Sequence, residues 1–121
     1  MNSTVKSSLD AINEISRQLL SQFDSYKESI EGDENPQELV EEHSIAEEQL
    51  ASLTEKRQCL ITELFNEYTQ EQISIELQIV NEMVSLDKQL TMKAQSNKQS
   101  LAEKMLKLRK HKKVTKIYQK Y

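Results

Sequence analysis

The chain has 121 residues, of which 36% are hydrophobic and 5% aromatic, and it contains no Trp. A single Gly and a single Pro exclude an all-β fold, because such folds need frequent turns. Long helices fit this composition, since a surface helix buries only one apolar stripe. We therefore expect a single all-α domain over residues 1–121.

The charge of the chain is distributed very unevenly. Residues 1–103 hold all 20 acidic residues and 8 of the 16 Lys and Arg residues, which gives them a net charge of −12. Residues 104–121 hold the other 8 basic residues and no acid, which gives a net charge of +8. A basic segment on an acidic body either folds back on that body or binds an acidic partner.

The residue types that carry catalysis or hold metals are sparse and poorly spaced for either role. A di-iron helical protein needs Glu-x-x-His pairs, but Val40 and Leu108 stand three residues before His43 and His111. Cys59 has no second cysteine, and one Gly cannot build a phosphate-binding loop. We expect no enzyme activity, no metal site and no cofactor, with His43 at the edge of a helix seam.

The chain shows no membrane or secretion signal. No stretch approaches the roughly 20 apolar residues that a membrane span needs. Residues 1–8 lack the apolar core of a signal peptide, and a single cysteine fits a reducing compartment. We expect a cytoplasmic protein without a membrane span.

The first helix is predicted over residues 4–30, with Ser3 or Thr4 as its cap. Ile15 and Leu20 widen its apolar stripe, which predicts contact with more than one neighbouring helix. Its seam positions alternate in steps of four and three, as in packed helices, with Ser16 filling one step. The apolar members of this seam are Val5, Leu9, Ile12, Leu19, Phe23, Tyr26 and Ile30.

The second helix is predicted from Pro36 to Tyr68, after a break around Gly32. Gly32 suits the left-handed residue that ends a helix, Asn35 suits an N-cap, and Glu38 suits the acid of a capping box. A short loop between long helices predicts an antiparallel hairpin. The seam of this helix consists of Leu39, His43, Ala46, Leu50, Leu53, Arg57, Leu60 and Leu64.

The first turns of the second helix are acidic. Acids at this end complement the positive end of the helix dipole, which is the favoured interpretation. An acidic docking patch is the alternative. The residues concerned are Glu38, Glu41, Glu42, Glu47 and Glu48.

The third helix is predicted to start near Gln70. Thr69 and Gln72 have the spacing of a capping box, and Tyr68 and Ile73 can form the hydrophobic staple that accompanies it. With neither Gly nor Pro nearby, the second helix could also continue. We favour a tight turn, because a straight continuation would leave long apolar stripes without partners inside the chain.

The apolar stripe of the third helix weakens in residues 91–100, where Ala94 is its only apolar member. A kink, fraying or a small-residue contact would each fit this segment, and a fourth helix could begin near residues 96–100. The predicted fold is an antiparallel bundle of three long helices, with a body over 1–95 and a basic C-terminal arm over 96–121. The stripe consists of Met83, Leu86, Leu90, Ala94, Asn97, Leu101, Met105 and Leu108.

The C-terminal half of the chain is the predicted partner-binding region, because an apolar stripe with flexible Met residues suits the docking of another helix. Nucleic acid is a weaker candidate, since the acidic body repels phosphate. The apolar face of the tail is also modest for a membrane-surface helix. The candidate partner-binding residues are Met83, Leu86, Leu90, Leu101, Met105, Leu108, Val114, Ile117 and Tyr118.

One pattern in the C-terminal helix consists of Leu86, Asp87, Asn97, Leu101 and Leu106, followed by the Lys-rich segment 112–118. This pattern resembles the FliT family of bacterial flagellar export chaperones, and the size, acidic body and helical hairpin are similar over nearly the whole chain. The resemblance implies a cytoplasmic chaperone that keeps the flagellar filament-cap protein, FliD, soluble and escorts it to the export apparatus.

The same resemblance implies a mobile C-terminal helix. In the FliT family this helix can cover the substrate-binding surface and move aside, and the segment after Ser96 corresponds to it by analogy. Two other functions remain open. A structural coiled-coil adaptor would pair its third helix with another copy in a homodimer, and a nucleic-acid binder would use the basic tail.

Overall fold

The computed structural model describes residues 4–32 and 36–119, with side chains described up to Lys110 except at Pro36 and Val40. The predicted all-α fold class is confirmed, because these residues form helices and no strand. None of the described helices is both long enough and apolar enough to cross a membrane. The four helices of the described residues are α1 (Val5–Gly32), α2 (Pro36–Glu67), the short α3 (Gln70–Ser74) and α4 (Leu77–Gln119).

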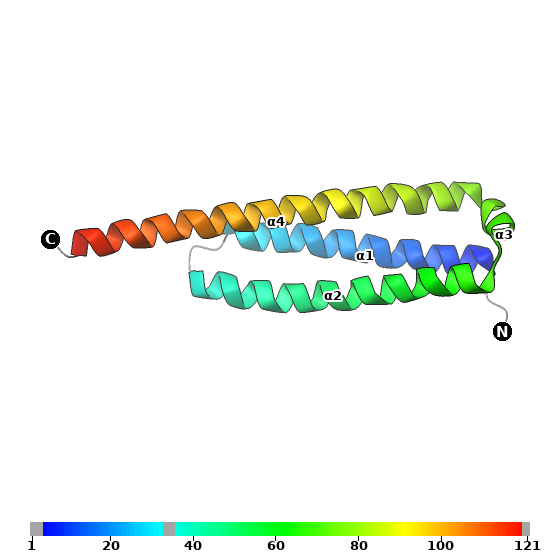
Figure 1. Cartoon of the computed structure of the whole chain (residues 1–121), viewed down its shortest axis with the longest axis horizontal. Helices are drawn as coiled ribbons and strands as arrows, with labels where there is room; N and C mark the ends of the chain where they lie inside the picture. Colours follow the sequence, from blue (N-terminus) through cyan, green and yellow to red (C-terminus); the bar gives the residue numbers. More distant parts are fainter. Residues whose placement is uncertain (1–3, 33–35, 120–121) are drawn as a thin grey trace.

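α1 is the central helix, and α2 and α4 lie along it on either side (Figure 1). On the α2 side, Ser29 of α1 is hydrogen-bonded to Glu42, and Ser16 to Arg57. Residue numbers on α2 therefore rise as those on α1 fall, so the two helices run in opposite directions. The wide apolar stripe predicted for the first helix is used on both sides.

α4 runs in the same direction as α1. The Nδ2 atom of Asn13 donates to the carbonyl oxygen of Ile79 at 3.4 Å, and Nδ2 of Asn97 donates to that of Phe23 at 2.8 Å. Both residue numbers rise together along this pair of helices. The direct contacts of α2 and α4 with α1 far exceed those of α2 with α4.

Among the described residues, buried apolar side chains gather in three clusters along α1. The cluster nearest α3 draws on α1, α2 and α3, the middle cluster on α1 and α4, and the third on α1 and α2. Because α1 contributes to every cluster, it is the element that the other helices cover. The clusters are Leu9, Ile12, Leu64 and Ile73; Ile15, Leu19 and Leu90; and Tyr26, Ile30 and Leu39.

Side-chain caps start two of the helices where the sequence predicts them. Ser7 N–H donates to Thr4 Oγ1 at 3.1 Å in front of α1. Gln72 N–H donates to Thr69 Oγ1 at 3.2 Å, and Thr69 N–H donates to Gln72 Oε1 at 2.8 Å, which completes the predicted capping box. Ser3, the alternative cap of the first helix, and Asn35, the predicted cap of the second, lie outside the described residues.

The prediction that a helix starts near Gln70 after a tight turn is confirmed, but the expectation that this helix runs on to the C-terminal end is wrong. α3 ends at Ser74, and α4 begins only at Leu77. Ile73 is buried in the cluster nearest α3, and Tyr68 packs against the same cluster. Burial of Ile73 holds α3 at the end of the bundle, so the chain has to turn again before it can run beside α1.

Gly32 does not adopt the left-handed conformation that the sequence suggests for it. It is the last residue of α1, and no described residue has a positive φ. Nothing lies within 4 Å of the position that a Cβ atom would take there. A Cβ atom at this position would therefore meet no steric conflict.

The predicted kink in residues 91–100 is wrong, because α4 is continuous through this segment (Figure 1). Polar contacts with α1 replace the missing apolar ones. Lys93 Nζ is 2.6 Å from Asp24 Oδ1, and Asn97 is buried with its amide on the Phe23 carbonyl group. Ala94, predicted to lie on the buried stripe, is instead exposed.

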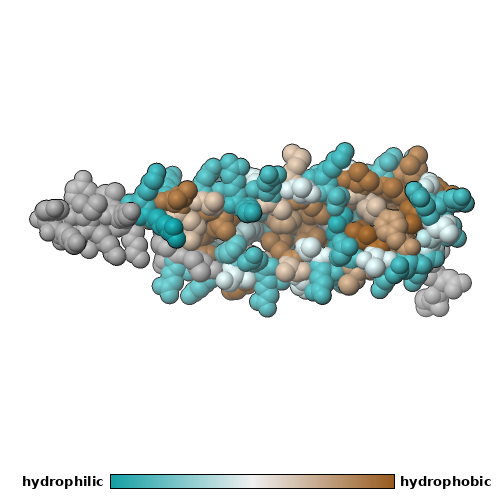
Figure 2. Space-filling model, in the orientation of Figure 1, coloured by the Kyte–Doolittle hydropathy of each residue, from teal (hydrophilic) through white to brown (hydrophobic). Residues whose placement is uncertain are grey.

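Large hydrophobic side chains are exposed at several positions of the described surface. Figure 2 shows hydrophobic surface between bands of hydrophilic residues, with much of it toward the α3 end. Such residues are normal when they are scattered singly over a surface. They are Ile45, Phe65, Ile75, Leu77, Val84, Met92 and Leu106.

The central position of α1 predicts which leucines carry stability. Leu9→Ala removes a side chain that is 0% exposed and should lower the free energy of unfolding by about 2–5 kcal/mol. Leu106→Ala, at a side chain that is 58% exposed, should change it by less than about 0.5 kcal/mol. Chemical denaturation followed by circular dichroism measures both, and equal losses would contradict the assignment of the core.

Candidate functional site

A groove of about 920 Å³ opens between α2 and α4, over α1. It exists because both flanking helices pack on α1 and make little contact with each other. Its apolar lining comes from all three long helices and is bordered by polar and charged side chains. The lining residues are Phe23, Tyr26, His43, Glu47, Leu50, Ala51, Thr54, Glu55, Gln58, Ala94, Asn97, Lys98 and Leu101.

Two exposed alanines contribute to the open space of this groove. Ala51 of α2 and Ala94 of α4 are both exposed in the described structure, and both line the groove. A methyl side chain at each position leaves room that a larger residue would fill. The residues on either side of Ala94 in its stripe, Leu90 and Asn97, are buried against α1. The groove therefore lies beside the segment of α4 in which the apolar stripe is thinnest.

Tyr26 and His43 form a polar contact in the wall of the groove. The Tyr26 hydroxyl group is hydrogen-bonded to His43 Nδ1, and the two rings lie 5.6 Å apart between centroids. His43 Nε2 lies 3.3 Å from Glu47 Oε2. A neutral imidazole that donates to Glu47 leaves Nδ1 to accept from the tyrosine. As predicted, His43 is half-buried at the edge of the seam.

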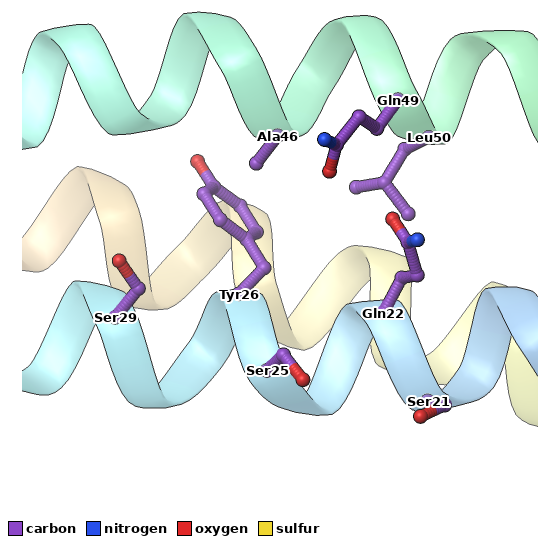
Figure 3. A pocket seen from close by; sticks show the side chains of 8 residues that line it. All are labelled: Ser21, Gln22, Ser25, Tyr26, Ser29, Ala46, Gln49 and Leu50. Atoms are coloured by element: carbon purple, nitrogen blue, oxygen red, sulfur yellow. The ribbon is translucent and has the colours of Figure 1, made fainter.

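A second hollow, of about 350 Å³, lies on the other side of Tyr26 and Leu50, which line both spaces. Figure 3 shows the Tyr26 ring reaching from α1 toward Ala46 of α2. Serine and glutamine side chains make up most of the lining of this hollow, so it suits an apolar partner less than the groove does. The remaining lining residues are Ser21, Gln22, Ser25, Ser29 and Gln49.

Arg57 connects all three long helices. Its Nε atom donates to Ser16 Oγ of α1 at 2.8 Å, and its Nη2 atom lies 3.1 Å from Asp87 Oδ1 of α4. Only 12% of its side chain is exposed. Because Asp87 stands seven residues before Ala94 on α4, the Arg57 bridge lies toward the α3 end of the groove and limits it there.

The sequence suggests this bridge only indirectly. Ser16 and Arg57 each interrupt an apolar seam, in the first and the second helix. Polar residues at seam positions of a hairpin can pair when the register brings them level. That register follows from packing, so the contact itself could not be read from the spacing within either helix.

The nine predicted partner-binding residues differ in their burial and in their contacts. Leu86 and Leu90 are buried, at 7% and 8% exposure, so they are occupied by contacts inside the chain. Leu101 lines the groove. The half-buried members that pack against core clusters are Met83, Leu101, Met105 and Leu108. The side chains of Val114, Ile117 and Tyr118 lie outside the described residues.

Most of the groove residues that the partner-binding prediction missed lie on α1 and α2, and the others are Ala94, Asn97 and Lys98 of α4. Phe23, Tyr26 and Leu50 are seam positions in the sequence, and we expected them to serve the core. Their partial use by the groove depends on the separation of α2 from α4. In the sequence, the feature that points to α1 as part of the groove is the wide apolar stripe of the first helix. A stripe of that width is larger than the surface that one neighbouring helix covers.

The basic end of α4 extends past the ends of α1 and α2 (Figure 1). Its last described hydrogen bond to α1 is a long one, from Lys104 Nζ to the Glu31 carbonyl oxygen at 3.5 Å. Leu108 still packs against the cluster of Tyr26, Ile30 and Leu39. The described contacts with the body therefore continue well beyond residue 96, where we predicted the arm to begin.

Other chemistry is sparse in the described part of the chain. No three His, Cys, Asp or Glu side chains gather there as a metal site requires. Cys59 is an exposed free thiol. Comparison of the chain with protein-family models, with curated proteins and with solved structures gives no match. The groove between α2 and α4 is the feature best suited to a partner.

The Arg57 bridge gives a prediction for stability. Arg57→Ala removes a charged hydrogen bond from a largely buried position and should lower the free energy of unfolding by about 1.5–3 kcal/mol. Asp87→Ala should cost less than about 1 kcal/mol, because the Asp87 side chain is 61% exposed. Denaturant titration of both variants tests this order, and a larger loss for Asp87→Ala would show that the ion pair dominates instead.

Tyr26 gives a prediction for the pH dependence of stability. Burial, and secondarily the charge of Glu47, raises the pKa of Tyr26 from 10.0 to about 12. The fold therefore favours the neutral phenol, and this contribution is complete below pH 10 and is lost as the pH rises toward about 12. Tyr26→Phe should lack this component of the loss when the free energy of unfolding is measured across that range. Parallel curves for the two proteins would contradict the assignment.

Proposed function

We propose that this protein is a chaperone for a helical client, and that an amphipathic helix of the client occupies the groove between α2 and α4. The observation that carries the proposal is the open apolar groove itself, with Phe23 and Leu50 beside the exposed Ala51 and Ala94. Docking in such a groove covers the apolar face of the client helix. A client that would otherwise aggregate is kept soluble in this way.

The arrangement of the helices supports a helical occupant over a small ligand. Three long helices with one open side form an incomplete bundle, and a fourth helix beside α2 and α4 would complete it. Packed helices lie about 8–10 Å apart, which suits a helix seated over α1 between two walls. The small exposed side chains Ala51 and Ala94 allow a client helix to approach closely.

The resemblance to FliT-type chaperones supplies the identity of the client. On this proposal, the client is the flagellar filament-cap protein, and the complex is delivered in the cytoplasm to the export apparatus. The acidic body and the basic end of α4 are separate surfaces in this scheme. The groove would hold the client, and the +8 segment would remain for an acidic partner.

The resemblance also implies that the C-terminal helix moves aside to open the binding surface. The contacts between α4 and α1 make such a movement energetically costly. Moving the segment after Ser96 away from α1 would break the hydrogen bond between Asn97 and the Phe23 carbonyl group. It would also remove the side chains of α4 that pack against the third core cluster, which are Leu101, Met105 and Leu108. We therefore favour α4 as a fixed wall of the groove, with any movement confined to its end beyond Leu108.

Substitution of Ala94 tests the proposal. Ala94→Gln places an amide group in the centre of the groove and should weaken binding of the purified filament-cap protein by about tenfold, because the amide loses its water when the client docks. The helix should be preserved, since Gln is a good helix former. Isothermal titration calorimetry measures the affinity.

Ala102→Gln is the matched control, because Ala102 is exposed on the same helix and does not line the groove. Its affinity for the filament-cap protein should stay within about twofold of the unsubstituted chain, as expected for a surface change away from the contact. Equal effects of the two substitutions would refute docking in the groove. Unimpaired binding by both variants would do the same.

A further inference from the structure

We propose that the groove selects a client helix whose apolar stripe is bordered by basic residues along one edge and by acidic residues along the other. This inference rests on the proposed docking function and adds the chemistry of the partner. It follows from the charges of the two walls. The α2 wall carries Glu47 and Glu55, whereas the α4 wall carries Lys98.

The charges on the two walls are accessible to a partner. The Glu47 side chain is 71% exposed, and Glu55 and Lys98 are exposed as well. Within the described residues, neither Glu55 nor Lys98 takes part in an ion pair, and Glu47 contacts only His43 of its own helix in this way. No ion pair closes the groove at this level, so the opposite charges of the walls face whatever lies between them.

The charge pattern sets the direction of the bound helix. Turning a helix end for end in the groove, with its apolar face still on α1, exchanges its two edges. A client with one basic and one acidic edge therefore meets both walls favourably in one direction only. A client with the same charge on both edges meets one wall with a repulsive contact in either direction, so its affinity is lower.

The size of the site defines the length of the client segment. Groove-lining residues on α2 extend from His43 to Gln58, which corresponds to about 22 Å of helix. The Arg57 bridge to Asp87 limits the site at one end. The bound segment is therefore about 15 residues long, or four helical turns.

Synthetic peptides of about 15 residues test the inference directly. Three helical peptides share one Leu and Ala stripe and differ at its edges, which carry Lys and Glu, Lys on both, or Glu on both. The unsubstituted chain should bind the mixed peptide about fivefold more tightly than either of the others, because each exposed charge pair changes the affinity by up to about that factor. Fluorescence anisotropy at low salt measures this.

Reversing the charge of one wall should change which of the three peptides binds most tightly. Lys98→Glu makes both walls acidic and should favour the peptide with two Lys edges. Glu47→Lys combined with Glu55→Lys makes both walls basic and should favour the peptide with two Glu edges. Lys88→Glu is the control for net charge, because Lys88 is exposed on α4 outside the groove, and it should keep the preference for the mixed peptide.

The outcomes separate this inference from the docking proposal. If all three peptides bind equally and Ala94→Gln weakens each of them, the charge selection is overturned while docking stands. If none of the peptides binds, or if Ala94→Gln weakens none of them, docking in the groove is overturned together with the selection. If Lys88→Glu shifts the preference as much as Lys98→Glu does, net charge explains the result and the inference is wrong.

Discussion

The burial of α1 by two helices that hardly meet each other is the constraint on which the rest of this structure depends. α1 supplies side chains to every core cluster of the described residues, and α2 and α4 each cover one side of it. In a bundle of this kind the central helix packs against two neighbours, whereas each outer helix packs mainly against one. The open space over α1, between the two outer helices, follows directly from that division.

Polar contacts complete the packing where apolar residues run out. Lys93 and Asn97 hold α4 to Asp24 and the Phe23 carbonyl group, and Arg57 joins α2 to both of its neighbours. A buried amide or guanidinium group needs its partner in one place, whereas apolar side chains tolerate small shifts. We infer that these contacts set the register of the helices and keep α4 straight through its weak segment.

Many residues that line the groove would be assigned to the core from the apolar periodicity of their own helix alone. Phe23, Tyr26 and Leu50 occupy seam positions, and Ala94 belongs to a stripe that should be buried. Of the residues predicted to bind a partner, Leu101 lines the groove, whereas Leu86 and Leu90 are buried inside the bundle. Periodicity within one helix identifies an apolar face, but it does not say how many neighbours share that face.

The sequence by itself determined the features that depend on neighbours along the chain: the all-α class, the start of α2 at Pro36, the caps at Thr4 and Thr69, and the separation of charge. These follow from local hydrogen bonding, helix propensity and composition. Only the tertiary structure decided the break before Leu77, the unbroken course of α4 and the groove. Those features depend on which faces of three helices meet, and that is set by packing between residues far apart in the chain.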